Sequence, residues 1–182
     1  MEDISGASAG AGIVDPGNKV YWGPRLWRLF HLLAEVSDRN DLYLLWPTFL
    51  RLTATIMPCA ACRQHLSVYL RTHSIMRFKA KSPITGPLVK QKIRADLLAL
   101  HNDVNSRLGK HTFTEADLSM YEVSEAYSRA TRLGEIAALH EEIRAAWAPL
   151  HHLRAEAGAY NDWKRSYQMI YALASGGPTN QI

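Results

Sequence analysis

The two cysteines of the chain lie close together, at Cys59 and Cys62, directly after Pro58. A two-residue spacer at the start of a helix allows two sulfurs to close a small disulfide ring or to bind one metal ion. Unpaired N–H groups and the helix dipole at such a position stabilise a thiolate at Cys59, which makes this sulfur the better nucleophile and leaving group. Because the chain has no other cysteine, the pair predicts redox chemistry rather than structural stapling.

Zinc binding is the main alternative, because two histidines, His65 and His73, follow the two cysteines closely in the sequence. A structural zinc site normally joins two separated pairs of ligands, whereas here three of the four side chains would crowd one helical turn. We therefore interpret His65 as a solvated helical residue and predict no metal site. A thioredoxin-like fold is a weaker alternative, since it needs strands around the motif and the flanking segments have helical patterns.

Two further groups of residues could bind a flat or anionic ligand. His101 and Asn105 lie one turn apart on one helical face, which could bind a nucleotide or could equally be a core histidine beside an exposed asparagine. Trp22, Trp27 and His31 could stack on a planar ligand, although filling the core is the commoner role of such side chains taken alone. Neither group identifies a ligand by itself.

The elements that position these residues are all expected to be helices. Apolar residues recur at helical spacing along most of the chain, and no stretch alternates apolar and polar residues for long enough to predict a strand. Gly109 supplies the left-handed residue that ends the fourth helix. The expected helices begin, in chain order, near Pro24, near Trp46, at Pro58, after the loop of residues 74–87, and at Thr114, the last running through Tyr121 and beyond.

Residues 124–182 predict a helical extension with two apolar stripes. One stripe runs from Leu133 to Leu150, and the other runs from Tyr160 to Tyr171. Each stripe must be buried, either by folding back onto the preceding helices or by self-association. We predict a homodimer to which the extension contributes.

Composition excludes several classes of protein. With 182 residues, of which 47% are hydrophobic and 21% charged, the chain resembles an ordinary globular domain that needs no disulfide framework. No apolar run approaches the roughly 20 residues that span a bilayer, and the first residues lack the pattern of a secretory signal, so we expect a soluble protein without a membrane partner. The net charge of +4 is spread along the chain, and nucleic-acid binding is therefore not expected.

Taken together and in this order, the three groups resemble the motifs of the FAD-linked sulfhydryl oxidases of the Erv/ALR family. Residues 21–31 resemble the family's W-G-x-x-x-W-x-x-x-H opening, and residues 58–62 match its P-C-x-x-C redox centre. Residues 100–110 are similar to its H-N-x-V-N-x-x-L-G-K signature, with Phe113 following as in the family. The chain looks most like the minimal oxidases encoded by large DNA viruses, which implies a location in the host cytoplasm or the virion.

The resemblance implies an all-α fold in which a four-helix bundle with a short fifth helix holds FAD at one end. It divides the chain into a disordered tail over residues 1–17, an FAD-binding sulfhydryl oxidase domain over residues 18–123 and the helical C-terminal extension. Aromatic faces would contact the flat rings, amides the ribose hydroxyls, and a cation the pyrophosphate. The implied FAD-binding residues are Trp22, Gly23, Arg25, Trp27, His31, Tyr69, His101, Asn102, Val104, Asn105, Lys110, Phe113 and Tyr121.

The implied reaction is the oxidation of a dithiol, in a protein substrate or a small redox carrier protein. The substrate would attack the disulfide at Cys59, Cys62 would pass the electrons to the flavin, and dioxygen would accept them as hydrogen peroxide. Because every residue assigned to chemistry precedes Val123, we expect a chain shortened to that residue to keep its activity. A helical binding or scaffold module, stapled by zinc or by a structural disulfide, is the alternative function.

Overall fold

The computed structural model describes residues 18–75, 85–148, 150 and 156–176, so the tail predicted over residues 1–17 lies outside it. Within these ranges the chain is helical and contains no strand, which confirms the predicted all-α class. None of the described helices is long and apolar enough to cross a membrane. The elements are α1 (Lys19–Glu35), α2 (Leu42–Ile56), α3 (Ala60–Thr72), α4 (Gly86–Arg107), the 3₁₀ helix η1 (Ala116–Tyr121), α5 (Arg129–Trp147) and α7 (Ala157–Ala174).

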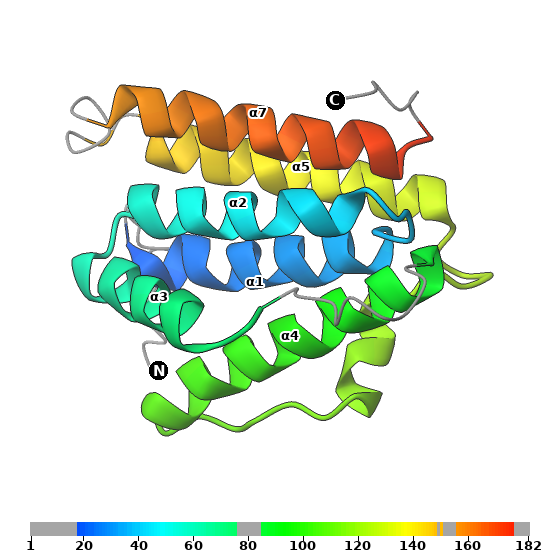
Figure 1. Ribbon diagram of the computed structural model, residues 1–182, viewed down its shortest axis with the longest axis horizontal. Helices are drawn as coiled ribbons and strands as arrows, with labels where there is room; N and C mark the ends of the chain where they lie inside the picture. The colour runs from blue at the N-terminus through cyan, green and yellow to red at the C-terminus, as the bar shows by residue number, and fades with distance from the viewer. Residues whose placement is uncertain (1–17, 76–84, 149, 151–155, 177–182) are drawn as a thin grey trace, which may run out of the picture.

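The helices form three layers, with α1 and α2 in the middle (Figure 1). On one side α5 packs on α1 and α7 packs on α2, and on the other side α4 packs on α1 and α3 packs on α2. The central layer is therefore covered on both faces, and its apolar side chains, such as Leu29, Phe30, Phe49 and Leu50, are almost completely buried. This burial is the main source of stability.

The first two helices begin earlier than predicted, so the expected starts near Pro24 and Trp46 are wrong. The Asn18 side chain accepts a hydrogen bond from the backbone N–H of Val20 and caps α1, which places Pro24 inside the helix. In α2, Pro47 also lies inside the helix, and the turn before Trp46 buries Leu42 completely. Tertiary packing and a good cap thus outweigh the backbone hydrogen bond that each proline removes.

The next elements follow the sequence more closely. The third helix starts at Ala60 rather than Pro58, because Cys59 acts as its N-cap. Gly109 has the expected positive φ, 63°, directly after α4. The carboxylate of Asp117 accepts hydrogen bonds from the backbone N–H and the hydroxyl of Thr114, as in a capping box. The element that follows is only a short 3₁₀ helix ending at Tyr121, so the prediction of a helix running beyond that residue is wrong.

The extension folds back onto the bundle, which buries both predicted stripes within one chain. Trp147 packs edge-on against Trp22 of α1, with ring centroids 5.6 Å apart. Trp163 of α7 stacks on Phe49 and donates a hydrogen bond from Nε1 to Oγ1 of Thr53 in α2, at 3.0 Å. The homodimer remains a prediction, but burial of the two stripes does not require a second copy of the chain.

Ion pairs and hydrogen bonds also join the extension to the bundle. The Arg129 guanidinium of α5 pairs with Asp38 and donates to the carbonyl oxygens of Val36 and Ala174, so one side chain joins α5 to α7 and to the end of α1. Glu135, also on α5, accepts a hydrogen bond from Arg28 of α1 at 2.8 Å. The extension is therefore bonded to the helix that carries the opening motif.

Candidate functional site

Cys59 and Cys62 form a disulfide at the beginning of α3, with their Cα atoms 5.1 Å apart. Both residues are half-buried, whereas Ala60 and Ala61 between them are exposed. The Sγ atom of Cys59 also accepts the backbone N–H of Cys62 at 3.2 Å, as an N-cap side chain does. The first turn of α3 thus offers a hydrogen-bond donor and the positive end of a helix dipole to any thiolate formed at Cys59.

A histidine beside the disulfide is paired rather than solvated, so the sequence interpretation of His65 is wrong. Its Nε2 atom lies 2.7 Å from Oδ2 of Asp103 on α4. Tyr69, one turn further along α3, is buried and stacks on His73 with ring centroids 3.9 Å apart. Burial, with the nearby Asp103 carboxylate, raises the pKa of Tyr69. The only sequence signal for this face is the four-residue spacing of His65, Tyr69 and His73, of which the last is the C-cap of α3.

Residues of the opening motif on α1 meet residues of the third motif across the interface between α1 and α4. The rings of Trp27 and His101 stack almost in parallel, with centroids 4.0 Å apart. Nε2 of His31 lies at hydrogen-bond distance from Nδ1 of His101, 3.0 Å. Tyr121, at the end of η1, stacks on His31 with centroids 5.0 Å apart. We call Trp27, His31, His101 and Tyr121 the aromatic seam.

The two histidines of the aromatic seam are held neutral. Burial, with the neighbouring His101 ring and the Arg94 charge, lowers the pKa of His31 to about 3. Burial and the Lys110 charge lower the pKa of His101 to about 4. At neutral pH the seam therefore presents flat, uncharged rings.

These shifts predict that the protein loses stability in acid. An unfolded histidine takes up a proton near pH 6.5, whereas His31 and His101 in the fold stay neutral down to about pH 3 and pH 4. The unfolded state therefore binds more protons in that window, and the free energy of unfolding should fall as the pH drops below 6.5, by at most about 1.4 kcal/mol per pH unit for each histidine.

Urea unfolding at pH 7, 6 and 5 measures this dependence. The variant His101→Gln, which has no titrating ring, should show a shallower fall than the unchanged protein. His73→Gln replaces an exposed histidine and serves as the control. A fall of the same steepness in His101→Gln and in the unchanged protein would contradict the assignment.

The two asparagines of the third motif hold the turn that follows α4. The Asn102 amide exchanges two hydrogen bonds with the backbone of Phe113, both at 2.8 Å. Asn105 donates from Nδ2 to the carbonyl oxygen of His111 at 3.0 Å. The Phe113 ring thereby lies beside His101, with centroids 4.9 Å apart, and Lys110 is left exposed at the turn.

The remaining candidates lie in different surroundings. Trp22 packs against the extension, and the Arg25 guanidinium pairs with Glu142 of α5 at 2.7 Å and lies over the Tyr21 ring. Gly23 has open space next to its Cα atom, and Val104 is half-buried in α4. These four residues were grouped with the seam by motif, but the contacts described here do not bring them to it.

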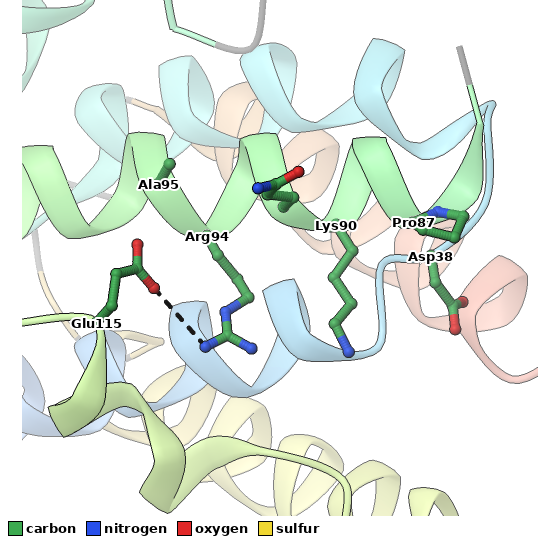
Figure 2. Close-up of a pocket in the computed structure, with 7 residues that line it drawn as sticks. Asp38, Pro87, Lys90, Arg94, Ala95 and Glu115 are labelled. Atoms are coloured by element: carbon green, nitrogen blue, oxygen red, sulfur yellow. Dashed lines mark ion pairs between the residues drawn. The ribbon is translucent and has the colours of Figure 1, made fainter.

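A pocket of about 560 Å³ is lined by residues of α4, by Asp38 after α1 and by Glu115 before η1 (Figure 2). The buried Glu35 carboxylate pairs with Nζ of Lys90 at 2.5 Å and with Nη1 of Arg94 at 2.9 Å. Arg94 also pairs with Glu122 at 3.1 Å, and the Glu115 carboxylate is 3.9 Å from it. Because these cations are matched by carboxylates, the pocket is an ion-pair network and does not present a free charge to an anion.

The aromatic seam and the turn after α4 fit a flat cofactor with an anionic tail. The neutral stacked rings can contact flat rings, and the turn held by Asn102 and Asn105 leaves the ammonium group of Lys110 exposed to an anion. In contrast, the described part of the chain gathers no group of three or more His, Cys, Asp or Glu side chains able to hold a metal ion. The disulfide also removes both sulfurs as thiolate ligands.

Comparison with known proteins agrees with this chemistry. A model of the Erv1/Alr family matches residues 24–127, which is more than half of the chain. The chain belongs to this family. The match contains the disulfide and every member of the aromatic seam, and it ends before α5, so the Erv1/Alr match leaves out both helices of the extension.

Two curated relatives of this chain are viral proteins. They are FAD-linked sulfhydryl oxidases of African swine fever virus, from a pig isolate and a warthog isolate. Each is 28% identical to this chain over 110 residues, which cover 58% of this chain and 83% of the relative. No solved structure matches the chain.

Proposed function

We propose that this Erv1/Alr protein is an FAD-linked sulfhydryl oxidase that introduces disulfide bonds into dithiol substrates. The observation that carries the proposal is the Cys59–Cys62 disulfide at a helix N-terminus, in one chain with a seam of neutral aromatic rings. The disulfide is a two-electron acceptor for a dithiol, and the seam suits a flavin. The names of the two viral relatives support the same activity.

The protein's own sulfurs perform the first half of the reaction. A substrate thiolate attacks Sγ of Cys59, which forms a mixed disulfide, breaks the bond to Cys62 and releases Cys62 as a thiolate. The second substrate thiolate then attacks the substrate sulfur of the mixed disulfide and releases Cys59. The substrate has lost two electrons and forms its disulfide, and the two cysteines have gained them. The backbone N–H of Cys62, which bonds to Cys59 Sγ, favours the departure of that sulfur as a thiolate.

The aromatic seam would hold the cofactor. Trp27, His31, His101 and Tyr121 would pack against its flat rings, and the turn fixed by Asn102 and Asn105 would place Lys110 near its phosphates. When bound, FAD supplies the two-electron acceptor that returns the cysteines to their disulfide state. The neutral state of His31 and His101 keeps the seam free of charges that would have to be desolvated.

The final electron acceptor and the substrate belong to the same proposal. Dioxygen would accept the electrons and leave as hydrogen peroxide, and the substrate would be a protein dithiol or a small redox carrier protein. A viral setting, in the host cytoplasm or the virion, is consistent with the two relatives and with a chain that has a single pair of cysteines.

The visible spectrum of the purified protein tests the proposal against the scaffold alternative. A yellow protein with flavin absorbance, released as FAD on denaturation, is the expected result. Anaerobic addition of a small dithiol should bleach that absorbance, and air should restore it. A colourless protein that contains stoichiometric zinc would overturn the proposal and support a stapled binding module.

Loss of either polar residue on the buried face of α4 should weaken FAD binding. His101→Ala removes a ring of the aromatic seam, and Asn105→Ala releases the turn that carries Lys110. Each should raise the dissociation constant by about tenfold or more, since a buried polar group left unpaired costs roughly 1–3 kcal/mol. Fluorescence titration with FAD measures the change, and Ser106→Ala, at an exposed position of the same helix, is the control. Unchanged affinity in both variants would place the cofactor elsewhere.

A further inference from the structure

We propose that the C-terminal extension completes the cofactor site, through Arg132 of α5 acting as a positioning residue for Tyr121. This inference rests on the proposed function, because it concerns the residues that would hold FAD. It assigns a role to a part of the chain that lies outside the family match. The argument depends on a short segment, residues 120–123, which we call the strap.

Arg132 holds the strap on both sides of Tyr121. Its Nη2 atom donates to the carbonyl oxygen of Met120 at 2.7 Å and to that of Glu122 at 3.1 Å. Its Nε atom donates to the same Glu122 oxygen at 3.2 Å. The planar guanidinium is suited to this bridging because its donors have a fixed fork geometry. Tyr121 is thereby held between two anchored peptide groups.

The anchored residue belongs to the aromatic seam. The Tyr121 ring stacks on His31 at an interplanar angle of 16°, and His31 is at hydrogen-bond distance from His101. A shift of the strap would therefore move an aromatic face away from the histidine that contacts the rest of the seam. The position of one wall of the site depends on a residue of the extension.

The Arg132 side chain is buried in the protein rather than exposed to solvent. The residue is only 2% exposed, although an arginine is rarely buried without partners. Its remaining donors face Glu135 at 3.2 Å, and its guanidinium lies 4.2 Å from the centre of the Tyr127 ring. A buried cation fully occupied by two carbonyl groups, a carboxylate and a ring indicates a built contact.

The bundle holds the strap less completely by itself. Arg94 of α4 pairs with the side chain of Glu122, and the backbone N–H of Val123 lies 3.4 Å from the Glu35 carboxylate. Both contacts are on the C-terminal side of Tyr121. In the described part of the chain, the side-chain hydrogen bond to the carbonyl of Met120, on the N-terminal side, comes from Arg132. The extension therefore supplies the second of the two anchors.

The test compares Arg132→Met with Arg129→Met in the full-length chain. Both arginines lie on α5, and both donate to backbone carbonyl oxygens and pair with a carboxylate, but Arg129 does not contact the strap. Arg132→Met should raise the dissociation constant for FAD by about 10–100-fold, a loss of the size known for residues that orient the ligands of a metal ion. Arg129→Met should lower the melting temperature with a much smaller change in FAD affinity.

A double variant distinguishes an effect of Arg132 on the position of Tyr121 from an effect on overall stability. In Tyr121→Leu, the additional change Arg132→Met should have little further effect on FAD affinity, because the ring it positions is already absent. Hydrogen exchange of the peptide covering residues 118–124, measured without FAD, should accelerate in Arg132→Met and not in Arg129→Met.

Equal losses of affinity in the two arginine variants would overturn the inference. An undiminished effect of Arg132→Met in the Tyr121→Leu background would do the same, as would unchanged exchange of the strap. A full-length protein that binds no FAD at all would instead overturn the proposed function, and hydrogen exchange would still decide whether Arg132 anchors the strap.

Discussion

Cys62→Ser is expected to abolish the oxidation of dithiols while FAD remains bound. The substituted hydroxyl cannot form the disulfide that accepts electrons, so turnover should fall by at least about a thousandfold, as for the loss of a reacting group in other enzymes. Binding should persist, because the proposed cofactor contacts come from the aromatic seam and the turn after α4. Oxygen uptake with a small dithiol measures turnover, and flavin absorbance measures occupancy.

Cys59→Ser should behave in the same way, because either serine prevents the disulfide. Ala61→Ser, between the two cysteines at an exposed position, introduces the same hydroxyl without removing a sulfur and is the matched control. It should retain most of the activity. Substantial residual turnover in either cysteine variant would refute the roles assigned to the pair.

Removing residues 124–182 is expected to prevent the bundle from folding stably, which reverses the expectation from sequence alone. The extension covers the outer face of α1 and α2, where it buries Trp22 and Phe49. A shortened chain would expose this apolar face to water and would lose the Arg132 anchor of the strap. Circular dichroism melting and size-exclusion chromatography should show loss of a cooperative transition and aggregation.

A point substitution tests the same interface in the full-length chain. Trp163 is completely buried against α2 and bonded to Thr53, so Trp163→Ala should lower the free energy of unfolding by about 3–5 kcal/mol. Arg165→Ala, on the exposed side of the same helix, should change it by less than about 0.5 kcal/mol. A shortened chain that melts cooperatively and binds FAD would contradict this account and restore the simpler view of a separable extension.

The sequence predicts where helices occur more accurately than it predicts the residues at which they begin. Apolar periodicity is a local pattern, so it identifies each helix that buries one face. The predicted starts near Pro24 and Trp46 are wrong because the local preference of a proline, Pro24 or Pro47, is overridden by other contacts, here the Asn18 cap and the burial of Leu42. The direction in which the extension packs could not be predicted either, since self-association and folding back bury the same stripe.

In the site, too, the residues of local motifs could be predicted, but contacts between distant segments could not. The family resemblance includes all four residues of the aromatic seam, but it also includes Trp22, Gly23, Arg25 and Val104, which the described contacts do not bring to the seam. Two pairs were missed, His65 with Asp103 and Arg132 with the strap, since each joins segments that are far apart in sequence or follow no motif. A signal for Arg132 was nevertheless present, because it lies on the same helical face as the buried residues Ile136, Leu139 and Ile143.

Oxygen consumption by the purified full-length protein, measured with a small dithiol and with hydrogen peroxide assayed in parallel, tests the central claim most directly. The account predicts dithiol-dependent oxygen uptake with an equal amount of hydrogen peroxide formed, by a protein that carries FAD. A flavin-containing protein that consumes no oxygen when supplied with a dithiol, and whose flavin is not bleached by it under anaerobic conditions, would contradict the account.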